Sequence, residues 1–378
     1  MTYALTIVGF VIALFAIVMI HELGHYVMAR AYGFRVLEYF LGFGQRLWSF
    51  RRGEIEYGVK AIPAGGYVKI AGMNPFENDV PPGDEHRAYG AKPRWQRALV
   101  ILAGPMSHFI VGGLILAVVV GVWGNPTGPW RVDEVPANIG PAGAPVISPA
   151  SLVGMRPDDL IVSVAGVPTS DIDALNGVVT ENIGRPIPVV AERDGRILTF
   201  TVVPVADQID GETKGRLGVV ITEVGRQHVG VPAAIVQGFG DVGRFSVESV
   251  SQIVRVFGPN GFGRVVRLLF TNEQREETDA SSVVGISREV GAAGERGDWE
   301  LALSFFAYVV IFIGLVNLLP LPPFDGGHLA VLAIEKVRGR AVDIKKLVPV
   351  SAVVLALLLF LTISTLVLDI SKPLPISP

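Results

Sequence analysis

Two histidines near the N-terminus have the spacing that a zinc ion requires. His21 and His25 stand four residues apart in the sequence His-Glu-Leu-Gly-His, with Glu22 directly after the first of them. On a helix, side chains four residues apart lie on the same face, so both imidazoles can bind one metal ion. The intervening glutamate can then act as a general base toward water. The sequence therefore predicts a zinc-dependent hydrolytic site.

The setting of this motif is unusual, because it ends a long apolar segment. Residues 4–20 carry no charged side chain. As a helix they would extend roughly 25 Å, most of the about 30 Å hydrocarbon core of a bilayer. A cleaved signal peptide fits poorly, because no basic residue precedes the segment and no small-residue cleavage site follows it. We therefore expect the zinc site to lie within a transmembrane helix.

A third ligand is expected, because catalytic zinc sites have three protein ligands and one open position. The chain contains no cysteine, so the ligand must be His, Asp or Glu. Asp325 is the candidate. It follows an apolar segment in the sequence Asn-Leu-Leu-Pro-Leu-Pro-Pro-Phe-Asp-Gly-Gly. The prolines there stop the helix, and an ionisable residue at membrane depth is a candidate functional residue. The alternative is that Asp325 only caps a helix.

The other histidines are weaker ligand candidates. His328 lies three residues after Asp325 and ranks below it. His108 lies inside a second apolar segment, where a structural hydrogen bond in the bundle interior is favoured over a role as an extra ligand. His86 and His228 are expected at the surface.

The composition predicts a polytopic α-helical membrane protein with a soluble part. Only 18% of the residues are charged, below the about 25% of soluble domains. The net charge of −3 argues against nucleic-acid binding. Four apolar segments have about the length of a membrane span. The predicted parts are transmembrane helix one at 1–30, a membrane-associated β segment and loop at 31–98, helix two at 99–123, an α+β domain at 124–206, an amphipathic helix and linker at 207–299, helix three at 300–330, a cytoplasmic loop at 331–346, and helix four with the tail at 347–378.

Basic residues in the short loops predict the orientation of these helices. Residues 335–346 and 30–97 are rich in Lys and Arg and are expected inside. The N-terminus, residues 125–300 and the C-terminal tail then lie outside. Helices one and three run in the same direction, so their C-terminal ends, which carry His25 and Asp325, are expected on the same, cytoplasmic side.

The remaining segments have weaker patterns. Alternation at 55–59 and 65–70 predicts two short strands beside the site, although an ordinary loop fits this pattern equally well. Residues 130–204 predict a compact α+β unit. Residues 232–257 predict an amphipathic helix, for which the membrane surface is slightly favoured over packing on the soluble unit. Residues 272–298 predict a mobile linker.

With these motifs, the chain resembles the site-2 protease family of intramembrane zinc metalloproteases. It is most similar to the bacterial branch that cleaves anti-sigma factors, and within it to the actinobacterial type with a single PDZ domain. The resemblance covers nearly the whole chain and rests on His21–His25, Asn317…Pro320…Asp325-Gly326, Ala103-Gly104-Pro105 and residues 63–69. One departure is His108, which stands where many relatives have asparagine.

The resemblance implies roles for these residues. His21, His25 and Asp325 would bind Zn²⁺, with Glu22 as general base and Asn317 holding the substrate carbonyl. The expected substrate is a transmembrane protein such as an anti-sigma factor, cleaved within the bilayer of the bacterial cytoplasmic membrane. Residues 124–206 would be an extracytoplasmic PDZ-like domain that contacts the substrate's ectodomain or C-terminus. The residues expected to contact the substrate are Gly65, Gly66, Tyr67, Val68 and Pro320.

Two other function classes are possible for such a chain. A metal transporter would explain His and Asp within the membrane, but it would not explain the glutamate beside His21. A non-catalytic scaffold that binds partners through a PDZ-like domain would not need an intact His21, Glu22 and His25.

Overall fold

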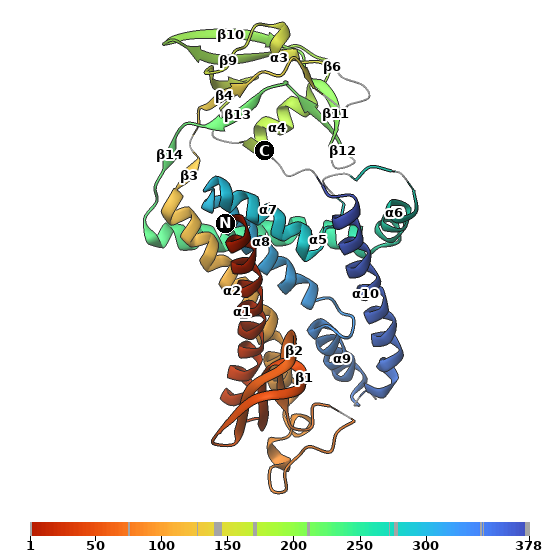
Figure 1. Cartoon of the computed structure of the whole chain (residues 1–378). Coiled ribbons are helices and arrows are strands. Elements are labelled where there is room, and N and C mark those ends of the chain that lie inside the picture. Colours follow the sequence, from red (N-terminus) through yellow and green to blue (C-terminus); the bar gives the residue numbers. More distant parts are fainter. Residues whose placement is uncertain are drawn as a thin grey trace. The chain divides into compact units, whose positions relative to one another are not determined.

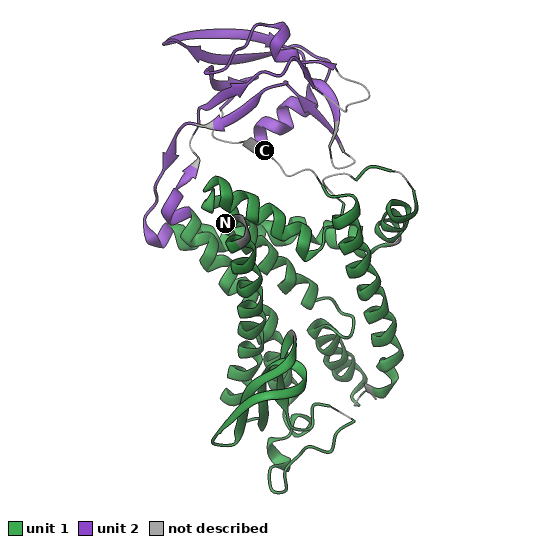
Figure 2. Ribbon diagram, viewed as in Figure 1, with its two compact units in different colours: residues 1–119, 234–275, 279–378 green, residues 120–233, 276–278 purple. Residues whose placement is uncertain are grey.

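The computed structural model describes residues 2–74, 76–126, 128–139, 146–168, 172–209, 212–271, 273–275, 279–340, 342 and 344–374. The chain folds into two compact units. Unit 1 comprises residues 1–119, 234–275 and 279–378, and unit 2 comprises residues 120–233 and 276–278 (Figure 2).

Among the residues that the structure describes, four helices are long and apolar enough to cross a membrane. They correspond to the four expected segments. The chain therefore combines membrane-type helices with β-sheets. The second helix begins at Arg94, before the predicted start at residue 99. In chain order (Figure 1) they are α1 (Thr2–Ala31), α2 (Arg94–Trp123), α8 (Trp299–Asn317) and α10 (Val348–Ser371).

Helices α1 and α2 pack closely through small residues. A Cβ atom at Gly24 would lie 2.3 Å from the carbonyl oxygen of Ala103, so only glycine allows this approach. One end of the pair is held by an apolar cluster that also includes residues of the following β segment. Its buried members are Ala29, Phe34, Val36, Ile55, Ile70, Tyr89, Val100, Ile101 and Leu332.

The segment between α1 and α2 is a long antiparallel hairpin of β1 (Val36–Arg52) and β2 (Ile55–Ile70). The two short strands expected at 55–59 and 65–70 are parts of this single strand β2, so the loop alternative is wrong. The hairpin is tied to α1, because the Tyr39 hydroxyl donates to the carbonyl of Met19 at 2.8 Å. At its turn, Glu54 pairs with Arg30 of α1 and with Arg87. The short helices η1 (Glu85–Arg87) and η2 (Tyr89–Ala91) complete this region.

Two expected loops are helical in the structure, and both predictions are corrected. The expected linker at 272–298 contains α7 (Val283–Arg296), and the expected loop at 331–346 begins with the end of α9 (Asp325–Arg338). Helix α7 packs on α1 through small residues: a Cβ at Gly294 would lie 2.6 Å from the Thr6 hydroxyl. Ile286, Val290 and Ala293 do recur at helical spacing and are packed in a core cluster. The linker prediction arises because three glycines, Gly285, Gly291 and Gly294, lie in the same stretch and lower its helix propensity.

The other helices of this part are α5 (Val231–Phe257), α6 (Pro259–Phe270) and η3 (Ile344–Leu347). The expected helix at 232–257 is therefore confirmed as α5. It packs within unit 1, where Phe245 stacks on Tyr308 of α8 with ring centroids 4.5 Å apart. Helix α10 is fixed at its end by a buried ion pair, in which Asp369 contacts Arg275 at 2.7 Å.

Unit 2 is an α+β unit built on an antiparallel sheet in the order β10-β9-β7-β4-β13, with β8 paired to β7. Its core includes Val132, Ile161, Val189 and Val202. The expected domain end at residue 206 is too early, because β13 pairs with β4 and belongs to the sheet. Its elements are β3 (Asn125–Pro126), β4 (Trp130–Glu134), β5 (Asn138–Ile139), β6 (Val146–Ile147), α3 (Pro149–Leu152), β7 (Leu160–Val164), β8 (Val167–Pro168), α4 (Ile172–Glu181), β9 (Ile187–Arg193), β10 (Arg196–Val202), β11 (Val205–Ile209), β12 (Glu212–Arg216), β13 (Val220–Glu223) and β14 (Arg226–Gln227).

Candidate metal centre

Three potential metal ligands meet inside unit 1. His21 and His25 lie one turn apart on α1, and Asp325 is the first residue of α9. Their ligand atoms all lie within 4.8 Å of one another. The Nε2 atom of His21 lies 3.1 Å from Asp325 Oδ2, and that of His25 lies 3.3 Å from the same oxygen. The two Nε2 atoms are 3.2 Å apart.

Asp325 reaches this position through a turn at the end of α8. Helix α8 ends at Asn317, the chain turns back over residues 318–324, and α9 begins. Cβ atoms at Gly326 and Gly327 would lie 2.2 Å from the carbonyl oxygen of Leu318 and 2.5 Å from the nitrogen of Pro322. The two glycines therefore let the start of α9 fold tightly against this turn. The N-cap of α9 is Phe324, so Asp325 does not cap the helix.

The hydrogen-bond partners of the two imidazoles set the orientation of their rings. His25 Nδ1 lies 2.8 Å from the carbonyl oxygen of Val100. A carbonyl can only accept a hydrogen bond, so the ring proton is at Nδ1 and the Nε2 lone pair points toward Asp325. His21 Nδ1 has a different partner on α2, the Nε2 atom of His108, at 3.0 Å. Both rings are thus oriented by α2.

The three atoms fit a divalent cation. A tetrahedral zinc site with bonds of roughly 2.0–2.1 Å places its ligand atoms roughly 3.3 Å apart, close to the distances of 3.1, 3.2 and 3.3 Å found here. Asp325 Oδ2 is buried and has no hydrogen-bond donor among the described residues. The His25 Nε2 lone pair and a carboxylate oxygen at 3.3 Å would repel each other without a cation between them, so the donor set suits Zn²⁺.

Small residues of α2 make room for the ligands. A Cβ atom at Gly104 would lie 2.3 Å from His25 Nε2 and 2.9 Å from His21 Cε1. This contact gives a physical reason for the glycine at position 104 of the Ala103-Gly104-Pro105 sequence.

Glu22 lies between the ligand group and the hairpin. Its titratable neighbours are His25, His21 and Asp325, and the backbone amide of Val68 in β2 lies next to its carboxylate. A Cβ at Gly66 would lie 3.1 Å from Glu22 Cγ. The structure therefore brings Gly66 and Val68, two of the expected substrate-contacting residues, next to the expected general base. Gly65 precedes them on β2.

The Tyr67 side chain is held within the hairpin. Its hydroxyl donates to Glu38, and its ring stacks on Phe40 with centroids 5.9 Å apart. Lys60 Nζ also donates to the Tyr67 hydroxyl at 2.6 Å. The backbone of Tyr67, and not its side chain, is thus the part that β2 can present to another strand.

The remaining sequence candidates lie outside the three-residue group. Asn317 is the half-buried last residue of α8, and Pro320 is exposed in the turn that follows. His328 is half-buried on the first turns of α9. His86 and His228 are exposed, as predicted.

A buried ion pair that the sequence did not reveal holds α9 to α2. Glu335, which is 5% exposed, accepts from Arg97 at 3.2 Å, and its other oxygen accepts from the backbone amide of Val342 at 3.1 Å. The helix that begins with Asp325 is thereby fixed at its far end. In the sequence, Glu335 stands in a basic segment and is indistinguishable from a solvated charge.

Comparison with known proteins identifies relatives over almost the whole chain. Residues 9–361 match Peptidase family M50. The chain is 34% identical to "Zinc metalloprotease Rip1" of Mycobacterium tuberculosis over 99% of both chains. It is 33% identical to the protein of the same name from Mycolicibacterium smegmatis over 100% of both. It is 30% identical to "Metalloprotease MmpA" of Caulobacter vibrioides over 89% of this chain and 88% of the relative.

Proposed function

The chain belongs to peptidase family M50 and is an intramembrane zinc metalloprotease, and from this premise we propose that His21, His25 and Asp325 bind the zinc and that Glu22 moves the proton. The observation that carries the proposal is the set of short distances between His21 Nε2, His25 Nε2 and Asp325 Oδ2. A catalytic site needs one more position open for water or substrate.

The chemistry then divides between the metal and the chain. When bound, Zn²⁺ polarises a peptide carbonyl and lowers the pKa of water at the site. Glu22 lies beside the ligand group, where its carboxylate accepts a proton from water and delivers it to the leaving amine. Asn317 ends α8 just before the turn to Asp325, and we assign its amide to hold the substrate carbonyl.

The substrate is a segment of a membrane protein, presented as extended backbone. A transmembrane helix satisfies its own backbone hydrogen bonds, so it must unwind before cleavage. We assign β2 as the strand onto which the opened segment adds, because Gly66 and Val68 lie beside Glu22. The main-chain groups that β2 offers are those of Gly65, Gly66, Tyr67 and Val68. We also assign a substrate contact to Pro320, in the turn between α8 and α9. An anti-sigma factor is the proposed substrate class.

The orientation follows from the basic segments. Residues 335–346 and 30–97 are rich in Lys and Arg, which favours the cytoplasmic side of a bacterial membrane for the end of α1 that carries the site. The N-terminus and unit 2 then lie outside the cytoplasm.

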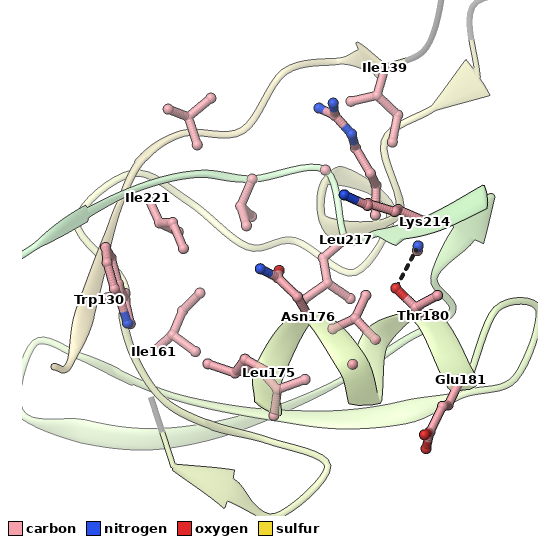
Figure 3. Close-up of a pocket in the computed structure, with 18 of the residues that line it drawn as sticks. Trp130, Ile139, Ile161, Leu175, Asn176, Thr180, Glu181, Lys214, Leu217 and Ile221 are labelled. Carbon is pink, nitrogen blue, oxygen red and sulfur yellow. Dashed lines mark hydrogen bonds between the residues drawn. The ribbon is translucent and has the colours of Figure 1, made fainter. Parts of the chain in front are cut away.

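Unit 2 is proposed to be a PDZ-like domain that binds peptide from the substrate's ectodomain or C-terminus. It contains a cavity of about 790 Å³ between α4 and residues 213–221. Figure 3 shows apolar side chains facing this cavity, among them Leu175 of α4, Leu217 and Ile221 of the other wall, and Ile161 of β7. Thr180 of α4 ties the walls together, because its hydroxyl accepts from the backbone amide of Gly215 at 3.1 Å. A groove between a helix and a strand suits an extended peptide.

The two rival functions differ in what Glu22→Gln would do. The variant removes the proton acceptor and keeps the three proposed ligands. A protease would lose cleavage, a transporter would still move metal, and a scaffold would still bind its partners.

The test compares membrane proteomes of cells that produce the wild-type protein or Glu22→Gln as the only copy. We expect membrane-spanning fragments of one or a few proteins to accumulate in the variant and to disappear when the wild type is restored. Identical fragment patterns in both strains would contradict a proteolytic role for Glu22.

A further inference from the structure

His108 is a buried histidine that the proposed mechanism does not use. It lies on α2, and only 2% of its surface is exposed. Its Nε2 atom lies 3.0 Å from His21 Nδ1, while its Nδ1 atom is buried without a hydrogen-bond partner among the described residues. A polar ring in an apolar helix interface costs free energy unless its hydrogen bonds compensate. The contact with His21 is the one that does so.

The direction of this hydrogen bond follows from the other side of the His21 ring. His21 Nε2 faces Asp325 Oδ2 and His25 Nε2, so a metal ion there takes the lone pair of that nitrogen. The ring proton must then be at Nδ1, which donates to His108 Nε2. His108 therefore accepts, and its own proton is at Nδ1.

The His108 ring is held in place by close packing between helices. A Cβ atom at Gly314 of α8 would lie 2.8 Å from His108 Cβ, so glycine at 314 leaves the space that the histidine needs. The residue is thus fixed against α8 on one side and His21 on the other. Helix α2, which carries His108, also orients the imidazole of His25 through the carbonyl of Val100.

We propose that His108 is a positioning residue, which accepts a hydrogen bond from His21 Nδ1 and thereby holds His21 Nε2 toward the zinc. Metal-binding histidines usually donate a hydrogen bond from the N–H of their second ring nitrogen to a carboxylate, a carbonyl or water. Here a neutral imidazole from another helix takes that place. The inference rests on the proposed function, because it requires that His21 is a ligand.

The experiment measures metal affinity in place of activity. Full-length protein in detergent is stripped of metal, and the zinc Kd is measured by competition with a chromogenic chelator. The variants are His108→Leu, which cannot accept a hydrogen bond, and His108→Asn, whose amide oxygen can. His328→Leu is the matched control, because it removes a histidine that lies near the site but outside the ligand group.

We expect His108→Leu to weaken zinc binding by about 10- to 100-fold, and His108→Asn to restore most of the affinity. His328→Leu should bind as the wild type does. The visible spectrum of the Co²⁺-loaded protein should change in His108→Leu and return toward that of the wild type in His108→Asn. Thermal unfolding of the metal-free proteins reports whether a variant is folded, so that a lost affinity is not mistaken for a lost structure.

The outcomes separate this inference from the function on which it rests. Wild-type affinity in a folded His108→Leu would overturn the positioning role and leave the protease assignment intact. Equal loss in folded Leu and Asn variants would also overturn it, because an accepted hydrogen bond would then not be what matters. A wild-type protein that binds no zinc would overturn both.

Discussion

Gly104 faces His25 at a distance that leaves no space for any side chain. A Cβ atom at this glycine would lie 2.3 Å from the Nε2 atom that points toward Asp325. Helix α2 therefore acts on the proposed site in two ways. It orients the imidazoles through Val100 and His108, and its glycine allows it to approach them closely without a clash.

Gly104→Ala should accordingly displace the His25 ring and weaken zinc binding. Gly9→Ala is the matched control, since a Cβ at Gly9 would have no atom within 4 Å. Both changes raise helix propensity by a similar amount, so the difference between them reports the clash. Zinc content after dialysis, measured by atomic absorption, should fall in Gly104→Ala only. Equal zinc content in the two variants would show that α2 moves away from the ligands at little cost.

The ion pair of Arg97 and Glu335 should hold α9, and with it Asp325, in place. Glu335→Leu leaves a buried arginine without its partner, which typically costs about 3–5 kcal/mol of stability. The variant should unfold at lower temperature in detergent and bind zinc less tightly. The double variant Arg97→Met/Glu335→Leu removes both charges and should recover most of the lost stability. If Glu335→Leu unfolds at the wild-type temperature, the pair does not anchor the helix.

The sequence predicts the grouping of His21, His25 and Asp325 better than it predicts the elements that position them. His21, Glu22 and His25 form a local motif, and Asp325 follows a run of prolines, so residue types and helix parity suffice to relate them. His108, Val100 and Glu335 act through contacts between helices that are distant in sequence. Nothing local distinguishes them from other core or loop residues. The role of Asn317 stays a prediction.

The same limit applies to the fold. Long apolar helices and the strong period of α5 follow directly from the sequence. Helix α7 is not predicted because its three glycines resemble a linker and outweigh the short apolar pattern of Ile286, Val290 and Ala293. Strand β13 is not predicted because its pairing with β4 is set by the sheet and not by its own four residues.

The backbone of Val68 should matter more than its side chain. Its amide lies next to the Glu22 carboxylate, and a proline there has no N–H to donate. We expect Val68→Pro to lower kcat/KM for two unrelated transmembrane substrates while zinc binding is retained, and Val68→Thr to cleave both nearly as well as the wild type. Unchanged cleavage of both substrates by Val68→Pro would remove β2 from the site.

Acid should release the hairpin from the end of α1 through Glu54. The hydrogen bond and charge of Arg87, together with the charges of Arg35 and Arg30, lower the pKa of Glu54 from its ordinary 4.5 to about 2. A lowered pKa in the folded state stabilises the protein above the unfolded pKa and is lost as the pH falls. The window here is pH 4.5 down to about 2.

Glu54→Gln should therefore be less stable than the wild type at neutral pH, and the difference should shrink as the pH falls through that window. Chemical unfolding in detergent at a series of pH values measures it. A difference that stays constant from neutral pH to acid would mean that the charge of Glu54 does not contribute.

The central claim is that one zinc ion at His21, His25 and Asp325, with Glu22 beside it, performs the cleavage. The most direct measurement determines zinc content and cleavage of a transmembrane substrate on the same purified samples of wild type, Glu22→Gln and Asp325→Ala. We predict one zinc per chain and cleavage for the wild type, bound zinc without cleavage for Glu22→Gln, and loss of both for Asp325→Ala. Full zinc occupancy in Asp325→Ala, or cleavage by Glu22→Gln, would contradict the account.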